Sequence, residues 1–419
     1  MLLGSFYTGL SGLRANAQAL NVIGDNLANV NTVGFKRRAA NFAEIMSSNT
    51  GSQNAAGNPI QIGLGVNTTE IISSFEQGAI QSTGIATQLA LDGNGFFVLA
   101  KDGVETFSRA GNFTLDAEGY LVNPDYSFVQ GYIAKNADGS IDVASAPTDI
   151  KIDLGTTSDP RSTSIVRFLT NLNAEADFAN GEEFQTSVEF FDSLGIGHTM
   201  TVTFTSTGAG TWDYAITTDD GTPGATATGS LTFDSYGVLT NVGAGSPADI
   251  DIDITGLSTG AADQTITWDL MDDTSSVPTS YLSQLGTSSS NGTLYQDGYT
   301  TGVLQDIGFR QDGTMFGYFS NGQTIDLAQL TIATFNNLHG LRQVGNNQYL
   351  GTAASGPASH GVAGSGGRGV TISHSLENSN VDMAEEFTNM IINQRGYQSN
   401  SKIITTIDTL LQETLNLKR

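Results

Sequence analysis

The sequence predicts a mainly β protein with a long α-helix at each end of the chain. Two of the three observations behind this prediction concern the ends: apolar residues recur every seven positions near the N-terminus and again near the C-terminus. The third concerns the middle of the chain, where apolar and polar residues alternate. We expect the terminal helices to pair as a coiled coil, with antiparallel sandwich- or barrel-like β domains nested between them.

The first helix is expected over residues 1–30. Its apolar positions follow a heptad over four repeats, the pattern of a helix that packs along another helix; the alternative is an amphipathic helix that packs only on its own domain. Its largest side chains form half of a candidate assembly seam: Leu3, Phe6, Leu10, Leu13, Leu20 and Leu27. Gly4, Gly9, Gly12 and Gly24 each cost about 0.8–1 kcal/mol of helix stability relative to Ala. We therefore expect this helix to be disordered in the monomer and to fold when packed against partners.

The second helix is expected to begin near Asn380, a residue suited to cap it, and to reach the end of the chain. Acidic residues occupy its first turn, and Lys418 and Arg419 close its last turn, as the helix dipole favours. A second heptad supplies the other half of the candidate seam: Met383, Phe387, Met390, Tyr397, Ile404 and Leu411. A helix of about 38 residues is roughly 57 Å long, a length typical of helices that pair with other helices.

Between the helices, alternating segments such as 199–205 and 250–254 are separated by Asp-Gly and Asn-Gly turns, which predicts antiparallel strands. Pairing of the terminal helices requires the β domains to be nested. The expected division is 1–30 with 376–419 as the helical coiled-coil domain, 31–70 as a connecting segment, 71–150 with 285–375 as a discontinuous first β domain, and 151–284 as an inserted acidic outer β domain.

Acidity is concentrated in the inserted domain. The 419 residues carry a formal charge of −25, and the stretch between Arg167 and Arg310 holds 19 acidic and no basic residues. Such a chain is unsuited to nucleic acid or anionic lipid. Its lack of cysteine excludes disulfides and thiolate metal sites. It has no apolar run of about 18 residues and no secretory signal pattern, so we expect neither membrane insertion nor a cleaved signal peptide.

The sequence offers no candidate catalytic, cofactor-binding or metal-binding residues. The histidines have no companions at the spacing of a metal or catalytic site: His198, His339, His360 and His374. Asp249, Asp251 and Asp253 could bridge calcium, but a solvated strand face is the commoner arrangement. The run Lys36-Arg37-Arg38 is too short to bind nucleic acid, and we expect it to pair with acidic residues of a neighbouring subunit.

Several motifs resemble one protein family. Residues 25–36, DNLANVNTVGFK, resemble the signature of bacterial flagellar rod, hook and hook-associated proteins, with these signature positions: Asn26, Asn29, Asn31, Thr32, Gly34, Phe35 and Lys36. Residues 91–97 and 108–121 are similar to the first β domain of that family, and residues 390–402 to its C-terminal helix. Residues 191–199, in the inserted domain, resemble the hook members in particular.

The resemblance implies a structural subunit of the extracellular bacterial flagellar hook, with no enzymatic activity and no cofactor. Hook subunits polymerise into a curved hollow helical tube, a universal joint that transmits torque from rod to filament. The implied partners are further copies of the chain, the distal rod protein, the hook cap, the hook–filament junction protein and the flagellar type III export apparatus, which exports subunits without a cleaved signal. The alternatives are the distal rod or another axial flagellar protein or, in a different class, a monomeric secreted β-rich adhesin or enzyme.

Overall fold

The computed structural model describes residues 2–45, 48–53, 59–136, 139–153, 155–243, 248–272 and 279–416. The chain forms two compact units. Unit 1 contains Met1–Leu154, Asp306–Gly317 and Thr324–Arg419, and unit 2 contains Gly155–Gln305 and Tyr318–Gln323. Unit 1 is therefore built from both ends of the sequence, while unit 2 is nearly continuous.

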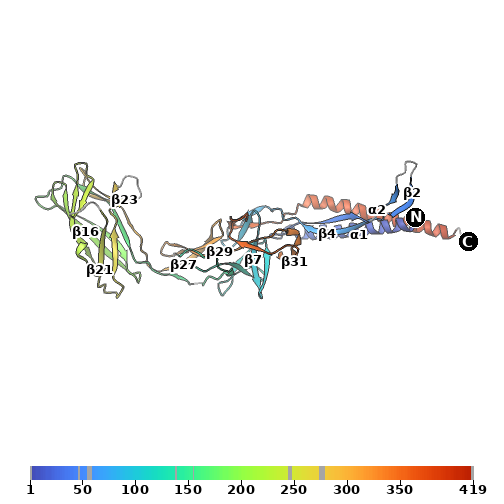
Figure 1. Cartoon of the computed structure of the whole chain (residues 1–419), viewed down its shortest axis with the longest axis horizontal. Coiled ribbons are helices and arrows are strands. Elements are labelled where there is room, and N and C mark those ends of the chain that lie inside the picture. The colour runs from blue at the N-terminus through green and yellow to red at the C-terminus, as the bar shows by residue number, and fades with distance from the viewer. Residues whose placement is uncertain are drawn as a thin grey trace. The chain divides into compact units, whose positions relative to one another are not determined.

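Two long helices in unit 1 lie side by side (Figure 1): α1 (Leu2–Ala28) and α2 (Met383–Asn416). This confirms the predicted pairing of terminal helices in a mainly β chain. The predicted cap residue is wrong, because α2 begins at Met383 and the Asp382 carboxylate accepts a hydrogen bond from the Ala384 N–H at 2.7 Å. The side chain of Asn380 instead donates to backbone carbonyls of residues 74 and 76. Lys418 and Arg419 lie outside the described residues.

A β-ribbon follows α1 along the chain and packs against it. In this ribbon β1 (Arg38–Glu44) pairs antiparallel with β4 (Val66–Ser73), and β2 (Ser48–Gln53) pairs with β3 (Pro59–Ile62). The Val66 N–H donates to the Ser11 hydroxyl at 3.2 Å, which ties the ribbon to the helix. The segment predicted only as a connection thus has regular structure of its own.

The main sheet of unit 1 contains the order β29-β11-β7-β8-β32-β31, and each neighbouring pair is antiparallel. The strands are β7 (Phe96–Lys101), β8 (Val104–Ser108), β11 (Phe128–Tyr132), β29 (Thr324–Leu330), β31 (Arg342–Gly345) and β32 (Gln348–Leu350). One buried cluster on this sheet consists of Phe96, Val98, Phe107, Ala333 and Tyr349.

Two short ladders join the two ends of the chain inside unit 1. β5 (Ile80–Ser82) pairs with β35 (Ser375–Glu377), and β6 (Leu89–Asp92) pairs with β34 (Val370–Ser373). The remaining elements outside unit 2 are β9 (Thr114–Leu115), β10 (Leu121–Val122), β12 (Thr148–Asp149), β30 (Ile332–Thr334), the 3₁₀ helix Leu338–Gly340 and β33 (Ser359–Gly361). β27 (Gly302–Phe309) and β28 (Thr314–Phe319) each contain residues of both units.

Unit 2 has two sheets that share one core. The five-stranded sheet is β15 (Glu183–Phe191), β16 (Gly197–Gly208), β17 (Thr211–Thr218), β19 (Thr228–Phe233) and β20 (Leu239–Val242). The six-stranded sheet is β18 (Thr222–Pro223), β21 (Ile250–Thr255), β22 (Gln264–Trp268), β14 (Ile165–Asn173) and β25 (Leu282–Leu285), with β26 (Ser290–Gln296) also on β14. Side chains from both sheets, including Trp212 and Trp268, form a single buried cluster.

The pairing in unit 2 departs from the antiparallel expectation at one strand. β14 runs parallel to both β22 and β25 and antiparallel to β26. Residues after 284 belong with this unit because β26 pairs along β14. The smaller elements are β13 (Thr157–Ser158), β23 (Met271–Asp272), β24 (Thr279–Ser280) and the 3₁₀ helix Ala225–Ala227. Among the described residues, no helix has the length and apolarity needed to cross a membrane.

Candidate functional site

The contact between α1 and α2 is made largely by small and amide side chains. A Cβ atom added to Gly12 would lie 2.8 Å from Asn400 Nδ2, and one added to Gly396 would lie 2.7 Å from Asn16 Oδ1. These glycines therefore let the two helices approach closely where Asn side chains fill the space between them. Gly9, also at the contact, faces Ile404. Glycines that sequence reasoning treated only as a weakness of the helix thus have a packing role.

The predicted seam on α1 lies beside this contact. Its described members are all half-buried: Phe6, Leu10, Leu13, Leu20 and Leu27. The buried positions of α1 belong to a neighbouring stripe that includes Ala15, Ala19, Val22 and Ile23. The side chain of Leu3 lies outside the described part of the chain. The heptad of large side chains and the contact with α2 are therefore on adjacent faces of α1.

On α2 the predicted seam is divided between half-buried and exposed positions. Met390, Ile404 and Leu411 are half-buried, whereas Met383, Phe387 and Tyr397 are exposed. Sequence reasoning left out the two most exposed isoleucines, Ile391 and Ile392, with 57% and 61% of their surface accessible. The sequence could have pointed to them, because they directly follow Met390, a position of the predicted heptad. The exposed apolar residues of α2 lie on two sides of the helix, which turns about 100° per residue. One side carries Met383, Phe387, Ile391 and Tyr397, a set that we name the α2 apolar face; the opposite side carries Ile392, Ile403 and Leu410.

The family signature begins at the last turn of α1, where Asn26 is fully buried. Its Oδ1 accepts the Arg38 N–H at 2.9 Å, and its Nδ2 donates to the Arg38 carbonyl at 2.8 Å and to Glu386 Oε2 at 3.2 Å. One amide side chain therefore connects α1, β1 and α2. Replacing it would leave buried backbone groups without partners, which costs about 1–3 kcal/mol for each group.

The rest of the signature shapes the turn after α1. Asn29 donates to the Asp25 carbonyl at 2.9 Å and accepts from the Thr32 hydroxyl at 3.1 Å, while Asn31 is exposed. Gly34 has φ +68°, and a Cβ there would lie 2.6 Å from the backbone N of Ala110, so only glycine fits. Phe35, the next residue, is buried.

Lys36 lies in a buried charged cluster with Glu377 and Arg109. Its Nζ donates to Glu377 Oε1 at 2.7 Å and to the Glu76 carbonyl at 2.7 Å. The same Oε1 accepts the Gly78 N–H at 2.8 Å, and Arg109 Nη1 lies 3.6 Å from Oε2. Burial lowers the pKa of Lys36, an effect that Glu377 partly offsets, and burial also lowers the pKa of Arg109. Two cations thus share one carboxylate where strand β35 meets the segments after α1.

The prediction that Lys36-Arg37-Arg38 pairs with a neighbouring subunit is wrong, because acids of the same chain pair with all three cations. Lys36 pairs with Glu377, as above, and Arg38 Nη1 lies 3.3 Å from Asp25 Oδ2. Arg37 contacts the first turn of α2, with 2.6 Å to Glu385 Oε1 and 2.7 Å to Glu386 Oε1. Glu385 and Glu386 stand far away in the sequence, but the pairing of the two helices brings them back to this point.

The other singled-out groups have structural partners. His198 is buried, with Nε2 3.3 Å from Asp192 Oδ2 and its ring stacked on Phe190. The carboxylates of the 249–253 strand accept hydrogen bonds from neighbours: Asp251 from Thr267, Asp253 from Thr265 and Asp249 from the Leu270 N–H. Across the described residues, no group of three or more His, Asp or Glu side chains could hold a metal ion.

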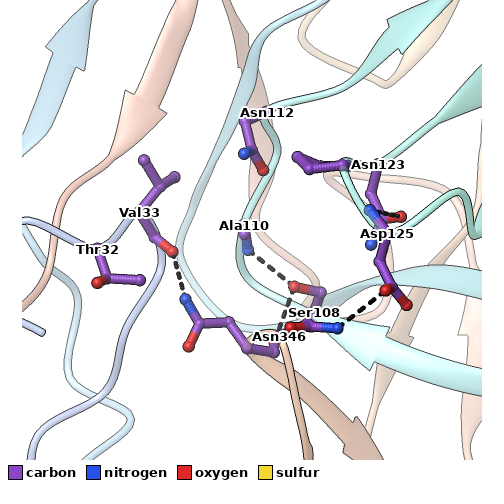
Figure 2. A pocket seen from close by; sticks show the side chains of 10 residues that line it. Thr32, Val33, Ser108, Ala110, Asn112, Asn123, Asp125 and Asn346 are labelled. Carbon is purple, nitrogen blue, oxygen red and sulfur yellow. Dashed lines mark hydrogen bonds between the residues drawn. The ribbon is translucent and has the colours of Figure 1, made fainter.

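A pocket of about 280 Å³ lies in unit 1 beside the signature turn (Figure 2). Its lining groups hydrogen-bond to one another: Asn346 Nδ2 donates to Asp125 Oδ1 at 2.9 Å, and Asn347 Nδ2 donates to the Val33 carbonyl at 2.8 Å. Asp125 belongs to the Pro124-Asp125 turn, where the Asn123 side chain accepts two backbone N–H groups. These bonds join the signature turn to two loops and give the pocket a structural role.

Comparisons with known proteins agree with this geometry. Four family models match the chain: "Flagella basal body rod protein" at residues 6–36, "Flagellar hook protein FlgE/F/G D1 domain" at 90–158, "Flagellar basal body protein FlaE D2 domain" at 170–299 and "Flagellar basal body rod FlgEFG protein C-terminal" at 372–417. The chain is also similar to the Helicobacter pylori flagellar hook protein FlgE2, whose crystal structure superposes with a TM-score of 0.52 at 16% identity over 71% of this chain and 100% of that one.

Relatives that match over the full length of the chain are flagellar hook proteins named FlgE. The chain is 34% identical to the flagellar hook protein FlgE of Treponema pallidum (strain Nichols) and to that of Borreliella burgdorferi, in both cases over 100% of each chain. It is 34% identical to the Escherichia coli K12 protein over 99% of this chain and 100% of that one. The chain therefore belongs to the flagellar hook protein FlgE family.

Proposed function

We propose that this chain, a structural and non-enzymatic subunit of the extracellular flagellar hook, polymerises with its own copies through the faces of its terminal helices. Membership of the family implies polymerisation within the flagellar axis. The observation that carries the finer proposal is the α2 apolar face, because its four large apolar side chains lie on one side of the helix and remain exposed in the chain by itself. Scattered exposed apolar residues are ordinary, whereas a patch of this kind marks an interaction surface.

The proposal assigns different roles to the two faces of α1. The small and amide residues at Gly12 and Asn16 pack against α2 of the same chain, and the half-buried leucine heptad beside them packs against helices of neighbouring copies. Complete burial of a large apolar side chain stabilises by about 1.5–3 kcal/mol, so the half-exposed residues of α2 contribute about 1 kcal/mol each. The four residues of the α2 apolar face on each copy therefore contribute about 4 kcal/mol to a contact between helices, before the costs of association.

The charged cluster gives this assembly a firm connection to the first β domain. Lys36, Arg109 and Glu377 join the segment after α1, strand β35 and the residue 108–111 turn, so the helices and the β domain of unit 1 are held together by buried contacts. In a curved rotating tube the inner helices keep the wall closed while polar outer surfaces re-form their wet contacts. This is the physical basis of the universal joint that we propose.

By resemblance, we further propose that the ends of the tube meet the distal rod protein and the hook–filament junction protein. The hook cap is the proposed partner during growth, and the flagellar type III export apparatus is the proposed partner before assembly. These four partners rest on the family alone, whereas self-association rests on the exposed face of α2 as well.

The test is polymerisation of full-length variants in precipitating salt, followed by sedimentation and negative-stain microscopy. Phe387→Asp and Ile391→Asp place a charge on the α2 apolar face, and Ser399→Asp places the same charge on an exposed polar position away from that face of the helix. We expect curved tubes from the native chain and from the Ser399 variant, and none from the other two. Tubes from all variants would contradict the proposed interface, and straight tubes from the native chain would favour a rod-like role.

A further inference from the structure

One outward surface of unit 2 is apolar and electrically neutral within a strongly acidic unit. We name it the Arg167 patch, and it consists of Ile165, Arg167, Leu169, Tyr281 and Tyr295. The unit as a whole contains 19 Asp and Glu residues against two Arg, a formal charge of −17. The patch therefore differs from its surroundings in both charge and polarity.

The alternation of β14 creates the patch. Val166 and Phe168 face the core, so Ile165, Arg167 and Leu169 face outward. The register of β26 places Tyr295 directly opposite Arg167, which puts both side chains on the same face of the sheet. Leu169 and Tyr295 remain 50% and 49% exposed, and Ile165 38%. No other part of unit 1 or unit 2 is needed to build this surface.

The Arg167 guanidinium is paired with a carboxylate and lies close to two tyrosine rings. The Arg167 guanidinium carbon lies 4.4 Å from the centroid of the Tyr281 ring and 5.5 Å from that of Tyr295. Its Nε donates to Asp269 Oδ2 at 2.9 Å. An Arg placed between two tyrosines is a combination enriched at the energetic centres of protein interfaces.

Charge disfavours the acidic surfaces of unit 2 as contacts between copies. The second Arg of the unit, Arg161, is paired with Asp297 at 2.9 Å, so neither cation is free to meet an acid of a neighbour. On the same sheet, β21 presents the exposed carboxylates of Asp251 and Asp253. Acids of two copies repel within a Debye length of about 8 Å, so contact between two units is favoured where one of them presents a surface whose own charges are paired.

We propose that the Arg167 patch is where unit 2 binds a second copy of this chain. The proposal rests on the polymeric function argued above. A helical polymer grows through contacts between different faces of successive copies, so the patch meets another face of its neighbour rather than itself. Five residues cover much less than the roughly 800 Å² per partner of a stable interface. The contact forms when the helices hold the copies together at high effective concentration, and it is weak enough to open as the tube bends.

The test uses three full-length variants. Leu169→Asp adds a charge to the patch, Tyr295→Ser removes an aromatic ring without adding charge, and Gln185→Asp adds the same charge to an exposed position on the five-stranded sheet. Trp268, packed behind the patch at 5.6 Å from Phe168, reports by its fluorescence that unit 2 is folded. The measurements are the critical concentration for polymerisation and the curvature of the tubes.

We expect both patch variants to raise the critical concentration at least tenfold or to straighten the tubes, while the Gln185 variant stays within twofold of the native chain. If Leu169→Asp and Gln185→Asp behave alike, or if Tyr295→Ser matches the native chain, the patch is not a contact and the inference is overturned. The Phe387→Asp variant separates the two proposals. Normal polymerisation of that variant contradicts the helical interface, whereas its failure alongside unchanged patch variants contradicts only the present inference.

Discussion

Replacing Glu377 by Gln removes the carboxylate that Lys36 and Arg109 share while keeping the size and shape of the side chain. The change leaves two buried cations facing a neutral amide, and the Gly78 N–H loses its charged acceptor. Removal of one partner from a buried ion pair costs about 3–5 kcal/mol. The matched control is Glu385→Gln, which removes a carboxylate that is half exposed and paired with Arg37. An exposed pair of this kind contributes about 0–1 kcal/mol.

Amide hydrogen exchange measured by mass spectrometry can assign the loss to the correct unit. Slowly exchanging amides of β7 and β8 report on unit 1, and those of β16 and β17 report on unit 2. A loss of 3–5 kcal/mol corresponds to exchange faster by roughly 10² to 10³·⁵, because each 1.4 kcal/mol is a factor of ten. We expect this acceleration in unit 1 of the Glu377 variant and no change in unit 2, where both tryptophans provide an independent fluorescence check.

The reasoning would be refuted if β7 exchanged at the same rate in the Glu377 and Glu385 variants. Equal acceleration in both units would also refute it, because the cluster would then support the whole chain rather than unit 1. A change in the Glu385 variant alone would mean that the exposed pair, and not the buried cluster, stabilises the helices on the β domain.

Burial raises the pKa of Tyr349 to about 12, so the folded chain keeps a proton that the unfolded chain loses near pH 10. The free energy of unfolding should therefore fall by roughly 2–3 kcal/mol as the pH rises from about 10 to about 12. Urea midpoints should show this fall in the native chain and its absence in Tyr349→Phe. Gly34→Ala should lower the free energy of unfolding by at least about 2 kcal/mol, because the added Cβ would collide with backbone atoms. Gly84→Ala should cost only about 1 kcal/mol, because Gly84 also has a positive φ of +76° but no neighbouring atoms near the added Cβ; thermal melts compare the two variants. Electron microscopy at low and high salt should show tubes of different curvature, because salt screens the repulsion between acidic units. Tubes of identical curvature at both salt concentrations would contradict this prediction. Amide exchange on the monomer should be fast across residues 2–28, and strong protection there would contradict assembly-coupled folding of α1.

The paired helices and the β middle could be predicted because both depend on the period of apolar residues, which the sequence displays directly. The face used between α1 and α2 could not be predicted from large side chains alone. Helix propensity counts the cost of Gly12 but not the Asn400 side chain that occupies the space it leaves. A search for small residues at heptad spacing, including Ala15 and Ala19, would have located this second stripe.

Contacts between residues that are far apart in the sequence also could not be predicted. The acids that pair with Arg37 lie in α2, and only the return of the chain brings them near. The parallel pairing of β14 was also hidden, because alternation marks a strand without giving the direction of its neighbours. By contrast, His198 and Asp192 lie six residues apart in one recognised motif, so their contact was open to inference from the sequence.

The ladders that join residues 80–92 to residues 370–377 impose an order on folding. Strand β35 must arrive before β5 has its partner, and the Lys36–Glu377 pair spans 341 positions of sequence. Unit 1 therefore cannot close until nearly the whole chain is available, whereas unit 2 needs only one nearly continuous stretch. A chain that becomes available from its N-terminus onward therefore completes unit 1, which carries the proposed polymer-forming helices, after unit 2.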